Sequence, residues 1–204
     1  MSPSPAELHT FLHSRRSVRF FAVEPVADEI VERVIESATW APNSHNRQPW
    51  FFVRLQSQPA REKLVAALTP HYIEALQEEG MSAEEAEGKA SVKNRKIMEA
   101  PEAILLCLDQ SRMDHYQDHH RDAGELVIAQ QSVALAGGQM LLAAHAEGLG
   151  SVWVCAPLFV PEKIQTALDL GANIIPQAVL LMGHMKEEPR PKTRRPLSEV
   201  LLKR

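Results

Sequence analysis

Two clusters of basic residues, one near each end of the chain, could together bind an anion. Arginine donates two parallel hydrogen bonds to a phosphate through its planar guanidinium, and a serine two residues away can add a hydroxyl donor. A compact phosphate site requires that the fold bring the two ends together, and each cluster alone is equally consistent with a solvated helix end. The clusters are RRSVR, with Arg15, Arg16, Ser17 and Arg19, and RPKTRR, with Arg190, Lys192, Arg194 and Arg195.

A polar loop between two prolines is the second candidate for binding. In APNSHNRQPW, residues 41–50, six consecutive polar side chains stand between Pro42 and Pro49. Each proline lacks a backbone N–H and favours extended geometry in the residue before it, so the segment is a poor helix and a poor strand. We interpret it as a loop that presents amides and hydroxyls. Its histidine, His45, could be a general acid or a hydrogen-bonded loop residue.

The other candidate arrangements favour neither a metal site nor a nucleophilic triad. In DHYQDHH, His115 and His119 are spaced one helical turn apart, and two histidines at this spacing can bind a metal. The sequence supplies no third ligand, so a polar surface turn is the preferred interpretation. The chain contains neither a GxSxG nucleophile motif nor a GxGxxG dinucleotide motif. A mononucleotide stays compatible, because side-chain cations could hold its single phosphate.

Composition limits the class of protein. The chain has 204 residues, 45% of them hydrophobic and 24% charged, which is typical of one globular domain over residues 1–204. The net charge of −4 argues against a nucleic-acid partner. Cys107 and Cys155 lie in apolar runs and are expected to be buried free thiols, which fits a reducing cytoplasm. The start lacks signal-peptide features and glutamines interrupt the apolar stretch 126–144, so no membrane association is expected.

Hydrophobic periodicity predicts the elements that position these residues. The patterns indicate an α+β fold with a small mixed or antiparallel sheet around one long central helix. That helix is apolar around nearly its whole circumference and must be covered on most sides. Gly137 and Gly138 in its middle suggest close approach of another backbone or of a partner helix. Helices are expected at 26–40, within 59–99 with a Ser82–Glu85 capping box, at 123–147 and at 161–170, and strands at 50–55, 102–108, 148–154 and 177–184.

These motifs, in this order, resemble the FMN-dependent nitroreductase superfamily over nearly the whole chain. The resemblance rests on RRSVRFF, APNSHNRQPW, the apolar helix ending in AAHAEGLGSVWV, IPQAVLLMGH and RRPLSEV. The segments EEGMSAEEAEGKASVKNRKIMEAPEAILL and GLGSVWVCAPLFVPEKI look most similar to the nitroreductase-type C-terminal domain of bacterial deazaflavin-coenzyme glutamyl ligases. The resemblance implies a nitroreductase-like fold and an intertwined homodimer, with two FMN molecules at the interface that are each touched by both subunits.

The resemblance also implies which residues bind the phosphate end and the pyrimidine edge of FMN. The phosphate and the ribityl end would be contacted by Arg15, Arg16 and Ser17. Arg194 or Arg195 would close on the phosphate from the C-terminal side, and Arg19 would lie near the pyrimidine carbonyl.

The loop and one later segment would contact the rest of the flavin. The resemblance places Pro42, Asn43, Ser44 and Asn46 against the polar edge of the ring and the ribityl hydroxyls, although Asn43 stands where the family often has Ser or Gly. It lines the ring with Val154, Cys155 and Ala156, with a backbone N–H directed at the nitrogen that accepts hydride. Trp40 and Trp50 would anchor the loop, and we expect both to be core residues.

The hypothesis that follows is an NAD(P)H-dependent oxidoreductase with a ping-pong mechanism. Hydride would pass to FMN, the nicotinamide would leave, and a small electron-poor acceptor, a nitroaromatic or a quinone, would take its place. FMN would carry the chemistry, so no catalytic side chain is assigned. Two alternatives stay open: a reductase in deazaflavin-coenzyme maturation, and a non-enzymatic flavin or deazaflavin carrier or sensor.

Overall fold

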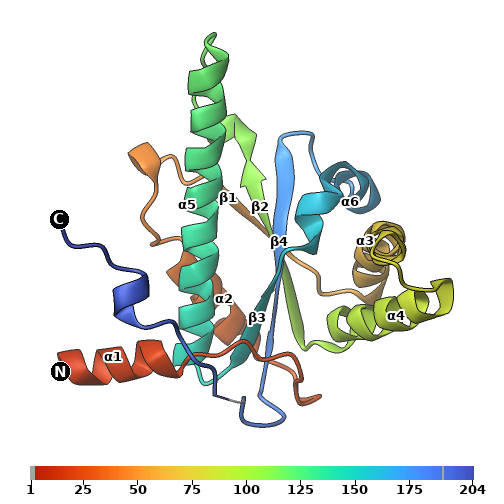
Figure 1. Cartoon of the computed structure of the whole chain (residues 1–204), viewed down its shortest axis with the longest axis horizontal. Coiled ribbons are helices and arrows are strands. Elements are labelled where there is room, and N and C mark those ends of the chain that lie inside the picture. Colours follow the sequence, from red (N-terminus) through yellow and green to blue (C-terminus); the bar gives the residue numbers. More distant parts are fainter. Residues whose placement is uncertain (1–2, 190) are drawn as a thin grey trace.

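The structure, a computed structural model that describes residues 3–189 and 191–204, has three layers (Figure 1). The middle layer is an antiparallel sheet of four strands, in the order β1 (Trp50–Arg54), β2 (Glu102–Asp109), β4 (Ile174–Gly183) and β3 (Gly150–Val154). One face is covered by α2 (Asp28–Ala38) and α5 (His119–Ala146), and the other by α3 (Gln58–Glu78), α4 (Ala83–Glu99) and α6 (Pro161–Leu168). The N-terminal helix α1 (Pro5–Ser14) crosses the C-terminal end of α5.

The two central strands contribute side chains to both cores. Ile104 and Leu106 of β2 pack with α2 and α5, whereas Leu105 and Cys107 face α3, α4 and α6. β4 alternates in the same way. A strand that is buried on both faces has no polar face to show, which explains why the sequence of β2 is a continuous apolar run.

The predicted α+β class and the order of the elements are confirmed, with a difference in the place of the long helix. α5 lies on one face of the sheet instead of being surrounded by it, and its N-terminal part extends beyond the other elements (Figure 1). By length and composition α5 could cross a membrane, but it packs against α2 and the sheet as a core helix does. Three of its apolar residues stay exposed, namely Val127, Ile128 and Leu135.

Polar caps set the starts of two helices. The predicted capping box is confirmed at α4, where Ser82 N donates to Glu85 Oε2 at 3.0 Å and Glu85 N donates to Ser82 Oγ at 3.3 Å. α5 begins earlier than predicted, because the carboxylate of Asp118 accepts a hydrogen bond from His120 N. His115 therefore lies outside the helix, and the two histidines do not share a helical face. Residues 3–189 and 191–204 contain no group of three His, Cys, Asp or Glu side chains arranged for a metal.

Gly137 gives room to a tryptophan of the same chain and not to another backbone segment of it, while contact of Gly138 with a partner helix stays a prediction. A Cβ added at Gly137 would lie 2.2 Å from Cζ3 of Trp153 in β3 and 2.7 Å from Cδ2 of Leu106 in β2. Gly138 has no such neighbour within 4 Å. The glycine thus lets the indole ring of Trp153, in the edge strand β3, approach α5 closely.

Replacing Gly137 with alanine is expected to lower the free energy of unfolding by roughly 1 to 3 kcal/mol, because the methyl group forces Trp153 to move. Urea denaturation measures the loss. Gly88→Ala is the matched control, since Gly88 lies inside α4 with nothing within 4 Å of the added methyl. That control should raise stability by up to about 1 kcal/mol, so equal effects of the two substitutions would contradict the packing argument.

Two burial predictions are half right. Cys107 is a buried free thiol, and burial raises its pKa to about 12, but Cys155 is exposed. The expectation for Cys155 was wrong because the apolar run continues past the strand, whereas Cys155 follows the last residue of β3, Val154. Trp50 packs against the core, whereas Trp40 is 79% exposed because α2 ends at Ala38 and the chain turns there.

Candidate functional site

The fold brings the two basic clusters to one cavity, as the phosphate hypothesis requires. This cavity, of about 460 Å³, is lined by residues from both ends of the chain. Its basic and hydroxyl residues are Arg15, Arg16, Ser17, Arg19, Lys192 and Arg194, and its acidic residues are Glu187 and Glu188. Arg195 is exposed and is not part of this lining, and Arg190 lies outside the described residues.

Residues 17–22 are fixed along the open edge of the sheet. Val18 N donates to Ser151 O of β3 at 2.9 Å, and Ala22 N donates to His184 O, just after β4, also at 2.9 Å. Gly150 permits this approach, because a Cβ there would lie 2.8 Å from Cβ of Val18. The bridge between Ser17 and Ser151 is parallel, so this segment and β3 run in the same direction.

The two adjacent arginines of the motif have different roles within the chain. Arg16 Nη1 donates to the carbonyl oxygens of His13 and Arg15, the latter at 2.8 Å, and so caps the end of α1. Arg15 Nη1 is buried and has no hydrogen-bond partner among the described residues. Of the two guanidinium groups, Arg15 thus has the unused buried donor.

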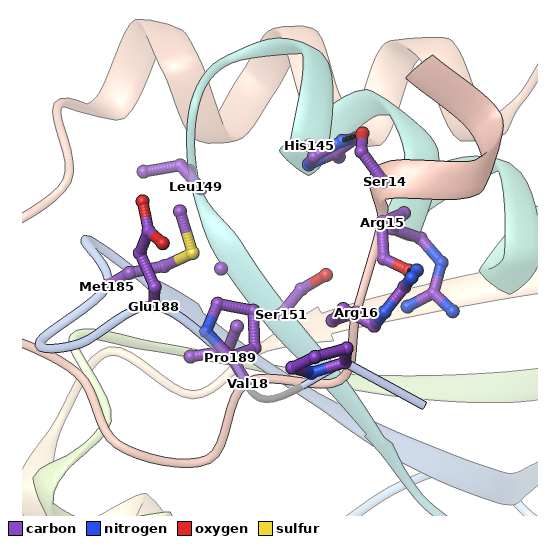
Figure 2. A pocket seen from close by; sticks show the side chains of 12 residues that line it. Ser14, Arg15, Arg16, Val18, His145, Leu149, Ser151, Met185, Glu188 and Pro189 are labelled. Atoms are coloured by element: carbon purple, nitrogen blue, oxygen red, sulfur yellow. Dashed lines mark hydrogen bonds between the residues drawn. The ribbon is translucent and has the colours of Figure 1, made fainter. Parts of the chain in front are cut away.

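A second cavity, of about 400 Å³, adjoins the first and shares Arg15 with it (Figure 2). Ser14 Oγ and His145 Nε2 lie 2.7 Å apart in its wall and join the end of α1 to the end of α5. Burial, together with the charge of Arg15, lowers the pKa of His145, so its imidazole is neutral at pH 7. Ser151 completes the wall, and its hydroxyl is buried without a partner among the described residues.

A third cavity, of about 230 Å³, continues from Arg19 to the end of β3. Lys93 and Lys96 of α4 add two further cations to its lining, beside Val154. Lys93 Nζ lies 3.5 Å from the centre of the Tyr72 ring, and burial lowers the pKa of this lysine. The three cavities together follow the segment 14–19 from α1 to β3.

Cys155 and Ala156 follow β3 directly at this end of the site. Trp153 Nε1 donates to Cys155 Sγ at 3.1 Å, which fixes the thiol beside the strand end. Cys155 and Ala156 stand at the start of a short 3₁₀ turn, Ala156–Phe159. Of the residues proposed to line a ring, Val154 therefore shares the third cavity with Arg19, and Cys155 and Ala156 follow it directly in the chain.

The polar loop has an unusual backbone that its own side chains hold. His45, Asn46 and Gln48 adopt left-handed φ angles of 50°, 53° and 50°, although none of them is glycine. Asn43 Oδ1 accepts a hydrogen bond from Gln48 N at 2.8 Å, and Asn43 Nδ2 donates to Ala41 O at 3.2 Å. Both ends of the Asn43 amide are thus used inside the loop.

The loop and the basic segment do not meet within one chain. Ser44 N donates to the hydroxyl of Ser132, near the middle of α5, whereas Ser14 contacts His145 at its C-terminal end. Positions 132 and 145 differ by 13 residues, which corresponds to about 20 Å along a helix axis. Figure 1 shows the same separation, with the loop at the upper left and α1 at the lower left. Residues 42–46 therefore lie away from the row of cavities of their own chain.

Sequence reasoning did not single out Ser151 or His145, which line the second cavity. Ser151 lies in a strand and His145 at the end of an apolar helix, so neither belongs to a polar motif. For His145 the position in the last turn of a helix was an available signal. Nothing in the sequence marks Ser151, because the signal is the absence of a partner for its buried hydroxyl.

Comparison with known proteins places this fold and site in context. A sequence model described as the nitroreductase family matches residues 12–184. The 5,6-dimethylbenzimidazole synthase of Rhodospirillum rubrum is 32% identical over 179 residues, which cover 85% of this chain and 80% of that protein. An Archaeoglobus fulgidus protein named as an NADH dehydrogenase/NAD(P)H nitroreductase is 24% identical over 181 residues, 87% of this chain and 84% of that protein.

A solved structure covers the whole chain. It is that of a nitroreductase from Desulfovibrio desulfuricans in complex with FMN, 27% identical, with a TM-score of 0.75. The superposition covers 100% of this chain and 98% of that one. The similarity thus extends to both basic clusters and to the loop.

Proposed function

This chain belongs to the nitroreductase family, and from that premise we propose that it is an FMN-dependent oxidoreductase that takes hydride from NAD(P)H. The acceptor is a small electron-poor molecule, a nitroaromatic or a quinone, which replaces the nicotinamide in a ping-pong cycle. The observation that carries the proposal is the single cavity formed by both basic clusters, next to a buried guanidinium N–H with no partner in the described chain.

The phosphate end of FMN fits the part of the site around Arg15. A buried guanidinium donor without an acceptor costs about 1 to 3 kcal/mol, and a phosphate oxygen removes that cost. Arg194 faces the same cavity from the C-terminal tail, so it is the better placed of the two candidate tail arginines. Ser17 contributes a hydroxyl, and Arg16 contributes mainly by fixing the end of α1.

The ring end of FMN fits the cavity between Arg19 and Val154. FMN, when bound, supplies the hydride chemistry, so the protein has to orient the ring and stabilise charge. Arg19, Lys93 and Lys96 provide positive charge on one side, and the backbone at Cys155 and Ala156 follows on the other. No side chain is required as an acid or a base.

The loop is supplied to the site by a second copy of the chain. Residues 42–46 lie about 20 Å from α1 along α5 in one subunit, so Pro42, Asn43, Ser44 and Asn46 reach a flavin only across a dimer interface. The apolar surface that an intertwined homodimer would bury is present on α5 and on the C-terminal tail. The exposed residues are Val127, Ile128 and Leu135, and Leu197, Val200, Leu201 and Leu202.

The proposed function is tested by the cofactor and by its reduction. The protein should purify yellow as a dimer by light scattering, and heat should release FMN. Under anaerobic conditions, NADH or NADPH should bleach the flavin absorbance in a stopped-flow experiment. Absence of reduction over minutes with both nucleotides would leave a non-enzymatic flavin carrier or sensor as the better description.

A second candidate activity comes from the R. rubrum relative, which is named for the synthesis of 5,6-dimethylbenzimidazole. Aerobic incubation of the FMN-loaded protein with NADH, followed by chromatography against a standard of that compound, tests it. Accumulation of the compound would replace the nitroaromatic or quinone acceptor in our proposal. A role in deazaflavin-coenzyme maturation predicts instead that a deazaflavin coenzyme competes with FMN or accepts its hydride.

We place the protein in the cytoplasm, where both free thiols stay reduced.

Replacing Arg19 with leucine is expected to lower the midpoint potential of bound flavin by roughly 30 to 60 mV and to slow its reduction by NAD(P)H. Arg19 lines both the phosphate-side and the ring-side cavity, so its charge lies where negative charge is added on reduction. A redox titration measures the shift, and Arg19→Lys, which keeps the charge, should retain most of the potential. An unchanged potential with a large loss of FMN affinity would assign Arg19 to the phosphate.

A further inference from the structure

The cavity beside α1 contains two buried donors that have no partner among residues 3–189 and 191–204. Ser151 is 3% exposed, and its hydroxyl has no hydrogen-bond partner among the described residues. The Nη1 atom of Arg15 is also buried and also has no partner among the described residues. Figure 2 shows the Ser151 hydroxyl pointing toward the side of the cavity that Arg15 and Arg16 line. Buried polar groups in folded proteins are almost always hydrogen-bonded. Two unpaired donors beside one cavity therefore indicate that an acceptor belongs there.

The charges around this cavity favour an anionic acceptor. Arg15 and Arg16 contribute two positive charges, whereas the acidic residue of the lining, Glu188, is exposed on the tail, where water screens it. His145 faces the cavity in its neutral form, because burial and Arg15 lower its pKa. A neutral acceptor would leave the guanidinium charge unpaired, so an oxyanion is the better match.

Backbone and side-chain contacts fix the two chain segments that carry these donors. Ser151 belongs to β3, and its carbonyl accepts the hydrogen bond of Val18 N, so the strand and the basic segment are fixed relative to each other. Arg15 directly follows Ser14, whose hydroxyl contacts His145 of α5, and the ring of His145 packs 4.8 Å from that of Phe11. The donors are thus positioned before any ligand binds, which lowers the entropy cost of binding.

We propose that a phosphate monoester, namely the phosphate end of FMN, binds where this cavity joins the one formed by the two basic clusters, at Arg15, which lines both, and that the Ser151 hydroxyl donates a hydrogen bond to it alongside Arg15. The inference rests on the proposed function and adds to it a phosphate ligand outside the basic clusters.

The test compares FMN with riboflavin, which has the same ring and ribityl chain but no phosphate. Ser151→Ala removes the hydroxyl and keeps the backbone bridge to Val18. In the full-length apo protein, flavin fluorescence quenching should show about a tenfold weaker affinity for FMN and an unchanged affinity for riboflavin. The ³¹P resonance of bound FMN should also shift between wild type and Ser151→Ala, and Ser151→Thr, which restores the hydroxyl, should recover the affinity. Ser91→Ala, an exposed serine of α4, is the control and should change neither affinity.

Three results would overturn the proposal. Equal weakening of FMN and riboflavin in Ser151→Ala would mean that the substitution disturbs the site as a whole. An unchanged FMN affinity would remove Ser151 from the phosphate. If Ser151→Ala weakens only the binding of inorganic phosphate, measured by its competition with FMN, the cavity is a site for free phosphate. Failure of the proposed function is a different result, because the wild type would then bind neither flavin.

Discussion

Arg15→Ala should weaken FMN binding by about 100-fold, the largest effect we expect from any single contact with the phosphate. The substitution removes a charge and a buried donor that has no partner among the described residues, so the wild-type protein breaks no contact seen in the structure when this donor binds phosphate. A hydrogen bond between a charged donor and a charged acceptor contributes about 1.5 to 3 kcal/mol. Arg15→Lys keeps the charge but loses the two parallel donors of the guanidinium, so its FMN affinity should lie between those of the wild type and Arg15→Ala. Fluorescence titration of apo protein with FMN measures all three.

Two controls separate the phosphate contact from a general loss of structure. Arg95→Ala removes an exposed arginine of α4 and should leave FMN affinity within about twofold, as expected for a surface position. Arg16→Ala should cost less affinity than Arg15→Ala, because its guanidinium already caps α1. An Arg16 effect equal to or larger than that of Arg15 would show that the unpaired donor of Arg15 is not the main phosphate contact.

The parts of the fold that follow from local pattern could be predicted from the sequence. Buried strands have continuous apolar runs, as in β2, and a capping box fixes a helix start, as at Ser82. The meeting of the two basic clusters could be stated only as a condition, since it depends on how residues 17–22 pair with the edge of the sheet. That pairing depends on Gly150, where a Cβ would lie 2.8 Å from Cβ of Val18, and the sequence does not show which residue approaches this glycine.

The errors share one cause, namely that a residue's type does not reveal which neighbour it will meet. Gly137 was expected to face another backbone or a partner helix, and within its own chain it faces the ring of Trp153. Trp40 was expected in the core because tryptophan is large and apolar, but the end of α2 turns it to solvent. Arg16 looks identical to Arg15 in the sequence, yet one caps a helix and the other keeps a free donor. Tertiary contacts decide each of these cases.

Asn43→Ala should also weaken FMN binding, on the order of 100-fold, through the shape of the loop. Three non-glycine residues, His45, Asn46 and Gln48, hold left-handed φ angles, at a cost of at least about 1 kcal/mol each. The amide of Asn43 offsets part of this cost by bonding Gln48 N and Ala41 O. Without it the loop relaxes to conformations that cannot close on a flavin in the partner subunit's site, and it must be reordered when FMN binds.

The strain argument makes Asn43 a positioning residue, and a second substitution can test that role. In the Asn43→Ala background, Gln48→Gly removes the penalty at one left-handed position and should recover about fivefold of the lost FMN affinity, because glycine adopts φ near 50° freely. Asn43→Asp keeps the acceptor for Gln48 N and loses the donor to Ala41 O, so it should lie between wild type and alanine. Amide hydrogen exchange over residues 43–48 should rise in Asn43→Ala and fall again in the double variant. If Gln48→Gly restores neither exchange protection nor affinity, Asn43 acts by touching the flavin directly, and the loop's own hydrogen bonds are secondary to that contact.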